Sequence, residues 1–314
     1  MSNQALPNAL PQDIALLIYT TMVRIHACDQ RIQQLLAAGA LQFQYYPCGG
    51  QEAIPASIAP HLHKNDQVVT TYRGVHDIVA KGTPMVEIIA EMMGKITGTS
   101  KGKGGAMHLS DPDAGLMVTT GIVGAGMPIA NGLALAAKLK GTGRVVVVNF
   151  GDGASNIGAF NESVNMAALW DLPIVFLCQN NAYAEYTSFE GSTKSANIAD
   201  RAAGYGMAGE TVDGTDPDAM HAAAGRAITR ARNGEGPTLL ECMALRLQGH
   251  SFGSEEGHMD QEKLAAARAN PPIAKFRASL IERGNATAED LDTIDADAKQ
   301  EVEDAVEKSM AADM

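Results

Sequence analysis

The chain has 314 residues, of which 46% are hydrophobic and 19% charged, and its formal net charge is −12. This composition is typical of a globular protein with an ample core, and acidity without a basic stripe argues against nucleic-acid binding. No apolar run has the length needed to cross a bilayer, and no basic segment followed by an apolar one suggests a signal peptide. Four scattered cysteines without a CxxC pair fit a reducing compartment, so we expect a cytoplasmic protein.

The first half of the chain predicts one long helix and few other regular elements. Residues 1–12, with two prolines, are expected to form an N-terminal arm. Apolar residues then recur at helical spacing from Ile14 to Leu36, and Gly39 ends the helix. Between residues 43 and 121 glycine and polar turns dominate, and we predict only a strand at 67–72 and a helix at 85–94.

From Gly121 onward predicted helices and strands alternate. In chain order, the helices are expected at 128–140, 158–170, 197–206 and 216–232, and the strands at 144–150, 173–179, 210–212 and 238–245. This alternation predicts an α/β fold with a doubly wound, mostly parallel sheet flanked by helices. Residues 13–270 are expected to form one domain, and two charged helices in 271–314 a helical C-terminal tail.

The segment from Gly151 to Asn181 joins two of these strands. It begins with Gly-Asp-Gly after one apolar strand and ends with Asn-Asn after the next, with a helical crossover between them. Parallel strands end at the same edge of a sheet, so Asp152 and Asn181 should lie together where open α/β sheets bind ligands. A carboxylate, an amide oxygen and a Gly-rich turn at a helix N-terminus suit a magnesium diphosphate.

Gly-Asp-Gly, this spacer and Asn-Asn resemble the magnesium–thiamine diphosphate motif of thiamine-diphosphate-dependent enzymes. The resemblance implies a thiamine-diphosphate-binding fold with three Mg²⁺ ligands: the side chains of Asp152 and Asn181 and the backbone carbonyl of Tyr183. The turn residues Gly153 and Ala154 would also contact the cofactor. The alternative is a plain βαβ unit with a helix-capping Asp and a turn-forming Asn pair.

Five further motifs narrow the resemblance. They are GGQEA at 49–53, TYRGVH at 71–76, GKGGAMH at 102–108, GIVGAGMPIANG at 121–132 and GHS at 249–251. Their order resembles that in the alpha subunit of heteromeric thiamine-diphosphate-dependent 2-oxoacid and acetoin dehydrogenases, the first component of those complexes. This family cleaves its substrate through a thiamine carbanion and passes the acyl group to a lipoyl carrier.

The same resemblance assigns further cofactor-binding residues. Arg73 can offer a bidentate fork to the terminal phosphate, with Tyr72 beside it as a donor. Gly121 and Val123 match positions where the family's backbone contacts the aminopyrimidine. A surface Tyr-Arg pair and a glycine-rich packing turn are the alternatives.

His250 matches the active-site histidine on a loop, so it is the candidate catalytic residue and a second phosphate contact. An exposed loop histidine without function is the alternative. His76 and His108 are weaker candidates, which structural hydrogen bonds could equally explain. Ser251 matches in register a position that is regulated in relatives, but the sequence SFGSEEGHMD lacks the usual SDP and YR, which argues against regulation here.

Two departures bear on the substrate. Tyr46 stands where pyruvate enzymes often have a substrate-contacting His, and NNAYAEYT at 180–187 is more similar to acetoin dehydrogenases. Both favour acetoin or a related 2-hydroxyketone. Decarboxylation of pyruvate or of a branched-chain 2-oxoacid stays open.

The resemblance also implies partners. The Glu that activates the cofactor lies on a separate beta subunit in this family, and no second pyrimidine-binding domain is evident here. We therefore expect two alpha and two beta chains, a lipoyl-bearing acyltransferase as acyl acceptor, and no activity of this chain alone.

Two other classes of function compete with this reading. Gly124-Ala-Gly126 resembles the start of a dinucleotide fingerprint, but the third glycine is missing and Asp152 follows 26 residues after Gly126, later than usual. A nicotinamide-dependent dehydrogenase is therefore the less favoured reading. A non-catalytic relative that has kept the fold is the other.

Overall fold

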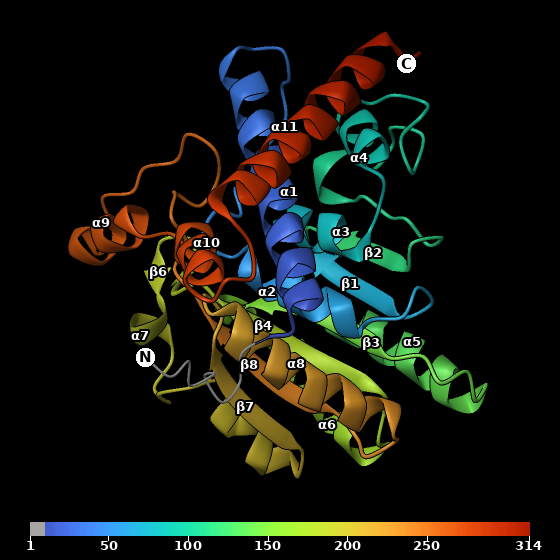
Figure 1. Ribbon diagram of the computed structural model, residues 1–314. Helices are drawn as coiled ribbons and strands as arrows, with labels where there is room; N and C mark the ends of the chain where they lie inside the picture. The colour runs from blue at the N-terminus through green and yellow to red at the C-terminus, as the bar shows by residue number, and fades with distance from the viewer. Residues whose placement is uncertain (1–9) are drawn as a thin grey trace.

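The computed structural model describes residues 10–314 (Figure 1). Its centre is a sheet of six parallel strands in the order β2-β1-β3-β4-β8-β7. The strands are β1 (Gln67–Thr71), β2 (Leu116–Thr120), β3 (Val146–Gly151), β4 (Ile174–Asn180), β7 (Ala208–Asp213) and β8 (Thr238–Met243). The prediction of a doubly wound parallel sheet is confirmed.

Helices cover both faces of the sheet, as its central strands require. Alternate residues of β3 point to opposite cores: Val147 belongs to one apolar cluster, and Val146 and Val148 belong to the other. Strands that are buried on both faces consist of continuous apolar residues, so the sequence alone predicts these central strands.

The helices divide between these two cores. The first face packs against α1 (Gln12–Ala37), α2 (Ala53–Ile58), α3 (Val75–Lys81), α4 (Met85–Met92) and α8 (Pro217–Arg232). The second packs against α5 (Gly126–Leu139), α6 (Gly158–Leu169) and the 3₁₀ segment Ala199–Tyr205. That segment is the helix predicted at 197–206, in 3₁₀ rather than α form, and its left-handed C-cap, Gly206, ends it after two turns.

The remaining elements follow β4 and β8. A two-stranded ribbon, β5 (Tyr183–Ala184) and β6 (Thr187–Ser188), leads into the short α7 (Phe189–Ser192). After β8 come α9 (Gln261–Ala269), α10 (Pro272–Glu282) and α11 (Ala288–Ala311). Thr287 begins α11 with a capping box that includes Asp290.

The two ends of the chain pack onto the same core. In Figure 1 the red helix α11 crosses beside the blue α1, and Arg24 of α1 pairs with Glu301 of α11 at 2.6 Å. Leu280 and Val302, from the expected tail, belong to the apolar core that α1 also joins. Of the expected arm, residues 1–9 lie outside the described part of the chain, whereas Leu10 is buried.

The elements that the sequence did not predict are short or polar. They include α2, α3 and α9, each of six to nine residues, and β2, an edge strand of five residues. Within residues 10–314 no helix has the length and apolar character to cross a membrane.

Candidate functional site

A cavity of about 690 Å³ lies at the carboxyl edge of the sheet. Segments that follow β1, β2, β3, β4 and β8 line it, as expected for a ligand site of an open α/β sheet. All ten predicted site residues are among those lining it: Tyr72, Arg73, Gly121, Val123, Asp152, Gly153, Ala154, Asn181, Tyr183 and His250. The fold thus brings together residues that are up to 178 positions apart in sequence, from Tyr72 to His250.

Asp152 follows β3 directly and is only 2% exposed. Its Oδ2 atom is buried and has no hydrogen-bond partner. Burial raises the pKa of this carboxyl to about 6, against the lowering effect of the Arg246 and Arg73 charges. A buried carboxylate oxygen without a partner is unfavourable unless a cation or proton is present, so this position fits a metal ligand.

Asn181 follows β4, the strand paired with β3. Its Nδ2 donates to Oε1 of Gln51 at 3.2 Å, and its Oδ1 accepts from the Tyr183 N–H at 3.4 Å. Gln51 is fully buried, lines the cavity and has an unpartnered Nε2, so it both orients the Asn181 amide and offers a free donor. The residue between, Ala182, has a φ of 71°, which turns the chain back on itself.

The carbonyl of Tyr183, the third predicted metal ligand, faces a guanidinium. Nη1 of Arg246 lies 3.4 Å from this oxygen. A carbonyl oxygen has two lone pairs, so one remains for a metal. Within residues 10–314 no cluster of three or more His, Cys, Asp or Glu could hold a metal, and the candidate site contains one carboxylate, one amide and one carbonyl. Such hard oxygen donors suit Mg²⁺ shared with phosphates.

Gly153 is required by close packing. A Cβ at this position would lie 2.5 Å from the Cβ of Ala184, on the ribbon after β4. The turn Asp152–Asn156 can therefore approach the ribbon only without a side chain at 153. This keeps the main chain after Asp152 at the cavity wall.

Two buried guanidiniums lie beside His250: Arg73 lines the cavity, and Arg246 contacts residues that line it. Arg73 donates to the carbonyls of Pro47 at 2.6 Å and His250 at 3.0 Å. Arg246, 1% exposed, donates to the carbonyls of Gln248 at 3.0 Å and Glu185 at 2.9 Å.

Among residues 10–314 the hydrogen-bond partners of both guanidiniums are carbonyl oxygens and histidine nitrogens, never carboxylates. Burial lowers the pKa of both, that of Arg246 to about 10. Two buried positive charges without a counter-anion fit a di- or triphosphate group.

His250 lies between these two guanidiniums. Its Nδ1 is 3.5 Å from Nη2 of Arg73 and 3.5 Å from Nη1 of Arg246. Nδ1 therefore faces donors, and the neutral ring carries its proton on Nε2. Burial, Arg73 and Arg246 together lower the pKa of His250 to about 4. The rings of Tyr46 and Tyr72 pack edge-on against the imidazole, with centroids 5.2 and 6.1 Å away.

The two weaker histidine candidates differ in position. His76 is buried beneath the cavity, where its Nδ1 contacts the Arg73 carbonyl at 3.1 Å and its Nε2 contacts Oε1 of Gln179 at 2.6 Å. It supports Arg73 rather than reaching the cavity. His108 is not among the lining residues either, but its ring packs against Gly121, 3.5 Å from where a Cβ there would be.

The motifs left three residues without a role. Arg246 belongs to none of the motifs, although its place directly after the apolar strand predicted at 238–245 is a signal that could have identified it. Gln51 was part of a motif without a stated contact. The third, Glu91 of α4, is fully buried and accepts from the N–H groups of residues 100, 102, 104 and 105 at 2.7–3.3 Å, which folds the glycine-rich loop beside the cavity.

Comparison with known proteins agrees with this geometry. The family model of the dehydrogenase E1 component matches residues 19–314. The alpha subunit of acetoin:2,6-dichlorophenolindophenol oxidoreductase from Bacillus subtilis is 40% identical, covering 96% of this chain and 90% of the relative. The same subunit from Cupriavidus necator is 41% identical over 98% and 92% of the two chains. The pyruvate dehydrogenase E1 alpha subunit from Rhizobium meliloti is 35% identical over 92% and 83%.

These matches cover nearly the whole chain, and the first relatives are alpha subunits of oxidoreductases. The expected resemblance is thereby confirmed, and with it an enzyme of the thiamine-diphosphate-dependent class. The chain belongs to the family of dehydrogenase E1 components.

Proposed function

We propose that this chain is the alpha subunit of a cytoplasmic acetoin dehydrogenase and that it holds the diphosphate end of thiamine diphosphate through Mg²⁺. One observation carries the cofactor assignment: a buried, unpartnered Asp152 oxygen and the Arg73 guanidinium line one cavity, and Arg246, likewise without a carboxylate partner, contacts the lining residues Tyr183, Glu185 and His250. The cation and the anion that these groups lack are the two halves of a magnesium diphosphate. The similarity to acetoin oxidoreductase alpha subunits supports the substrate class.

The residues divide the work of binding. Asp152, Asn181 and the Tyr183 carbonyl would ligate Mg²⁺, and Arg73 and Tyr72 would hold the terminal phosphate. The main chain at Gly153 and Ala154 would contact the diphosphate, and that at Gly121 and Val123 the aminopyrimidine. Bound there, thiamine diphosphate would supply a thiazolium carbanion as the nucleophile and a means of stabilising negative charge on the substrate.

His250 has the chemistry of a phosphate contact and a proton carrier. Without an anion it is a neutral ring whose Nε2–H is free of the two guanidiniums. A phosphate beside it would offset the charges that lower its pKa and bring proton exchange closer to neutral pH. We infer that His250 donates to the phosphate or to the substrate from Nε2.

The active site is completed by a beta subunit. Among residues 10–314, Asp152 and Glu185 are the only carboxylates that line the cavity; the first belongs to the metal side, and the second residue is exposed. Within this part of the chain no second buried carboxylate of the cavity is therefore available to activate the pyrimidine ring, which supports a Glu contributed by the partner.

An apolar surface near the cavity suits that partner. Ile122 and Val123, which line the cavity, are 71% and 51% exposed, and Ile129 in the first turn of α5 is 41% exposed. Exposed apolar patches of this kind mark protein interfaces. We propose that the beta subunit covers this surface in an assembly of two alpha and two beta chains, with a lipoyl-bearing acyltransferase as acyl acceptor.

The test uses the chain with and without its beta-type partner. With thiamine diphosphate, Mg²⁺ and 2,6-dichlorophenolindophenol, the reconstituted pair should oxidise acetoin, and the alpha chain alone should not. Turnover by the single chain would overturn the shared-site proposal. A preference for pyruvate or a branched-chain 2-oxoacid would overturn the substrate assignment but not the cofactor assignment.

Pyruvate decarboxylation is the second candidate because of the 35% identity to a pyruvate dehydrogenase E1 alpha subunit. Tyr46 argues against it. This ring lines the cavity with its centroid 4.3 Å from that of Tyr72, so a phenol rather than an imidazole faces the substrate region. A phenol does not carry positive charge toward a 2-oxoacid carboxylate, whereas an imidazolium can.

A further inference from the structure

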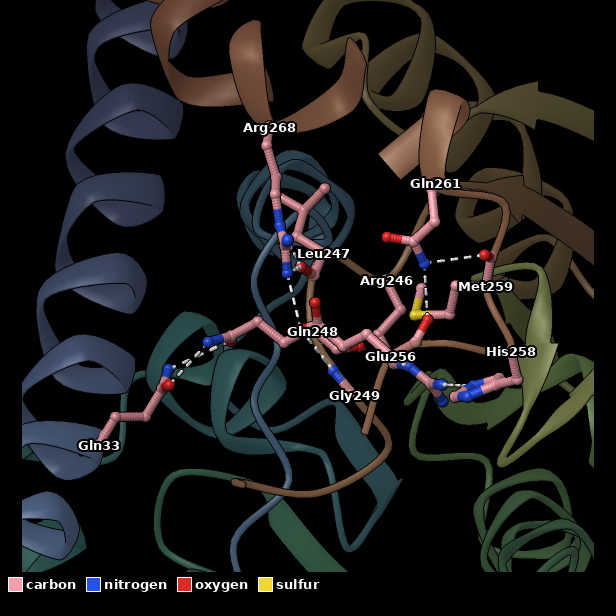
Figure 2. Close-up of polar contacts among 10 residues, drawn as sticks. All are labelled: Gln33, Arg246, Leu247, Gln248, Gly249, Glu256, His258, Met259, Gln261 and Arg268. Atoms are coloured by element: carbon pink, nitrogen blue, oxygen red, sulfur yellow. Dashed lines mark hydrogen bonds and ion pairs between the residues drawn. The ribbon is translucent and has the colours of Figure 1, made fainter. Parts of the chain in front are cut away.

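The segment that carries His250 has no helix or strand between Met243, where β8 ends, and Gln261, where α9 begins. Figure 2 shows a set of polar contacts around this loop. We propose that Glu256 and Arg268 form a latch that positions the His250 loop and so sets the affinity of this chain for thiamine diphosphate. The inference rests on the phosphate-binding role proposed for His250.

Glu256 joins two parts of the loop through one atom. Its Oε1 accepts from the Gly249 N–H at 3.2 Å and from Nη2 of Arg268 at 2.7 Å. Gly249 is the residue before His250, so the carboxylate acts on the main chain next to the imidazole. A Cβ at position 249 would lie 2.5 Å from the Ser254 carbonyl oxygen, which shows how tightly the loop closes there.

Arg268 of α9 contacts the part of the loop between β8 and His250. Its Nε and Nη2 donate to the Leu247 carbonyl at 2.8 and 2.5 Å. The next carbonyl, of Gln248, accepts from Nε of Arg246 at 3.0 Å. Three consecutive residues before His250 are thereby fixed by side chains, two of them by the Glu256–Arg268 latch.

Two more contacts close the arrangement. The Gln248 side chain exchanges hydrogen bonds with Gln33 of α1 at 2.8 and 3.3 Å. Gln261, the first residue of α9, donates to the carbonyls of Glu256 and Met259 at 2.8 and 2.9 Å. As Figure 2 shows, these side chains come from α1, from α9 and from the loop itself, so the loop is held between separate elements.

The latch is partly exposed, with 30% of the Glu256 side chain and 43% of the Arg268 side chain accessible. An ion pair in such a position adds little to global stability. Its effect should be local: without it, a loop held mainly by polar contacts opens more often, and His250 spends less time between Arg73 and Arg246. Cofactor affinity falls in proportion to the fraction of chains in the competent arrangement.

Hydrogen exchange of the full-length chain, without metal or cofactor, tests the latch directly. Glu256→Gln and Arg268→Gln should each accelerate exchange of amides in 247–252 by roughly tenfold. Glu210→Gln is the matched control, because Glu210 is 33% exposed and pairs with Arg226 at 2.5 Å away from the cavity-lining residues. The melting temperature of all three variants should stay close to that of the wild type.

Affinity for thiamine diphosphate with Mg²⁺, measured by calorimetry on the chain with its beta-type partner, gives the second readout. Kd should rise roughly three- to tenfold in either latch variant, and the double variant should be no weaker than the single ones, because one unit is lost in each case. Unchanged exchange and unchanged Kd in the latch variants, with a wild type that binds, would overturn the latch alone. A wild type that binds no cofactor would overturn the proposed function, and the effect on affinity with it.

Discussion

The two sides of the cavity are built in different ways. On one side, Asp152 and Asn181 come directly after β3 and β4, which pair with each other along all of β3 at the centre of the sheet. On the other side, His250 belongs to a loop that side chains hold in place. A backbone scaffold therefore positions the metal ligands, whereas a polar network positions the histidine.

This difference separates two kinds of sensitivity. The strand-end side has a geometry fixed by the sheet. It is electrostatically unfavourable without a ligand, because Asp152 is buried with an unpartnered oxygen. The loop side has no helix or strand to fix its geometry, so the position of His250 depends on individual hydrogen bonds. Substitutions on the first side should remove binding outright, and those on the second should weaken it by degrees.

The largest effect is expected for Asp152→Ala. It removes the carboxylate of the proposed metal site, so Mg²⁺-dependent binding of thiamine diphosphate should fall by about a hundredfold, the upper end of the roughly 1.5–3 kcal/mol that a charged hydrogen-bond partner is worth. Calorimetry with and without Mg²⁺ measures this, with circular dichroism to verify the fold. An unchanged affinity would mean that the metal site is elsewhere.

Arg73→Gln should have the next largest effect. It removes a buried charge that faces the proposed phosphate site, and a charged hydrogen bond is worth about 1.5–3 kcal/mol, or roughly 10- to 100-fold in affinity. Arg73→Lys should restore little, because a lysine cannot reproduce the two-ended contact to Pro47 and His250. Titration with inorganic diphosphate reports the anion site without the rest of the cofactor. Full recovery by lysine would indicate that charge alone matters there.

The sequence was sufficient to predict the strand-end side of the cavity and every strand of the six-stranded sheet except β2. Buried parallel strands appear as uninterrupted apolar runs, so the positions just after them, Asp152 and Asn181, could be predicted to meet. The family motifs supplied Arg73 and His250. The short α2, α3 and α9 carry too few turns for a periodic signal, and β2 is a short edge strand.

Other site features depend on contacts that no local pattern encodes. The latch joins Glu256 to Arg268 twelve residues later, across a helix that was not predicted. Arg246 contacts carbonyls of the ribbon 61 and 63 residues earlier, and Glu91 binds amides of a loop up to 14 residues later. These pairings exist only once the chain has folded, so residue type and spacing alone did not reveal them.

Gly153→Ala should weaken cofactor binding by roughly tenfold through packing alone. The new methyl would lie 2.5 Å from the Cβ of Ala184, so the turn after Asp152 must move away from the ribbon. Ala184→Gly removes the opposing methyl, and the double variant should recover most of the affinity. Failure of this rescue would show that the main chain at 153, rather than its distance from the ribbon, limits binding.

The pH dependence of the free energy of unfolding should have opposite signs for Asp152 on the strand-end side and His250 on the loop side. Burial raises the pKa of Asp152 from 3.8 to about 6, so the metal-free folded state holds this proton more tightly than the unfolded state. The stabilisation is complete below the unfolded pKa and is lost as pH rises toward and through 6. Above pH 6, Asp152→Asn should therefore be more stable than the wild type by as much as about 3 kcal/mol, and Mg²⁺ with diphosphate should reduce the difference.

His250 should show the opposite dependence, and a smaller one than its pKa shift alone implies, because the residue is only partly buried and solvent screens the neighbouring charges. Burial and the two guanidiniums lower its pKa from 6.5 to about 4, so the unfolded state takes up the proton first and stability is lost as pH falls from 6.5 toward 4. His250→Asn cannot titrate, so the difference in denaturation midpoint between wild type and this variant should shrink or reverse over that interval. Urea denaturation of the metal-free chain at pH 4.5, 5.5, 6.5 and 7.5 measures both dependences in one series. A wild type that gains stability relative to His250→Asn on acidification would contradict this expectation. It would mean that the folded state favours a protonated imidazole beside Arg73 and Arg246. The loop side would then contain an anion that these residues do not supply.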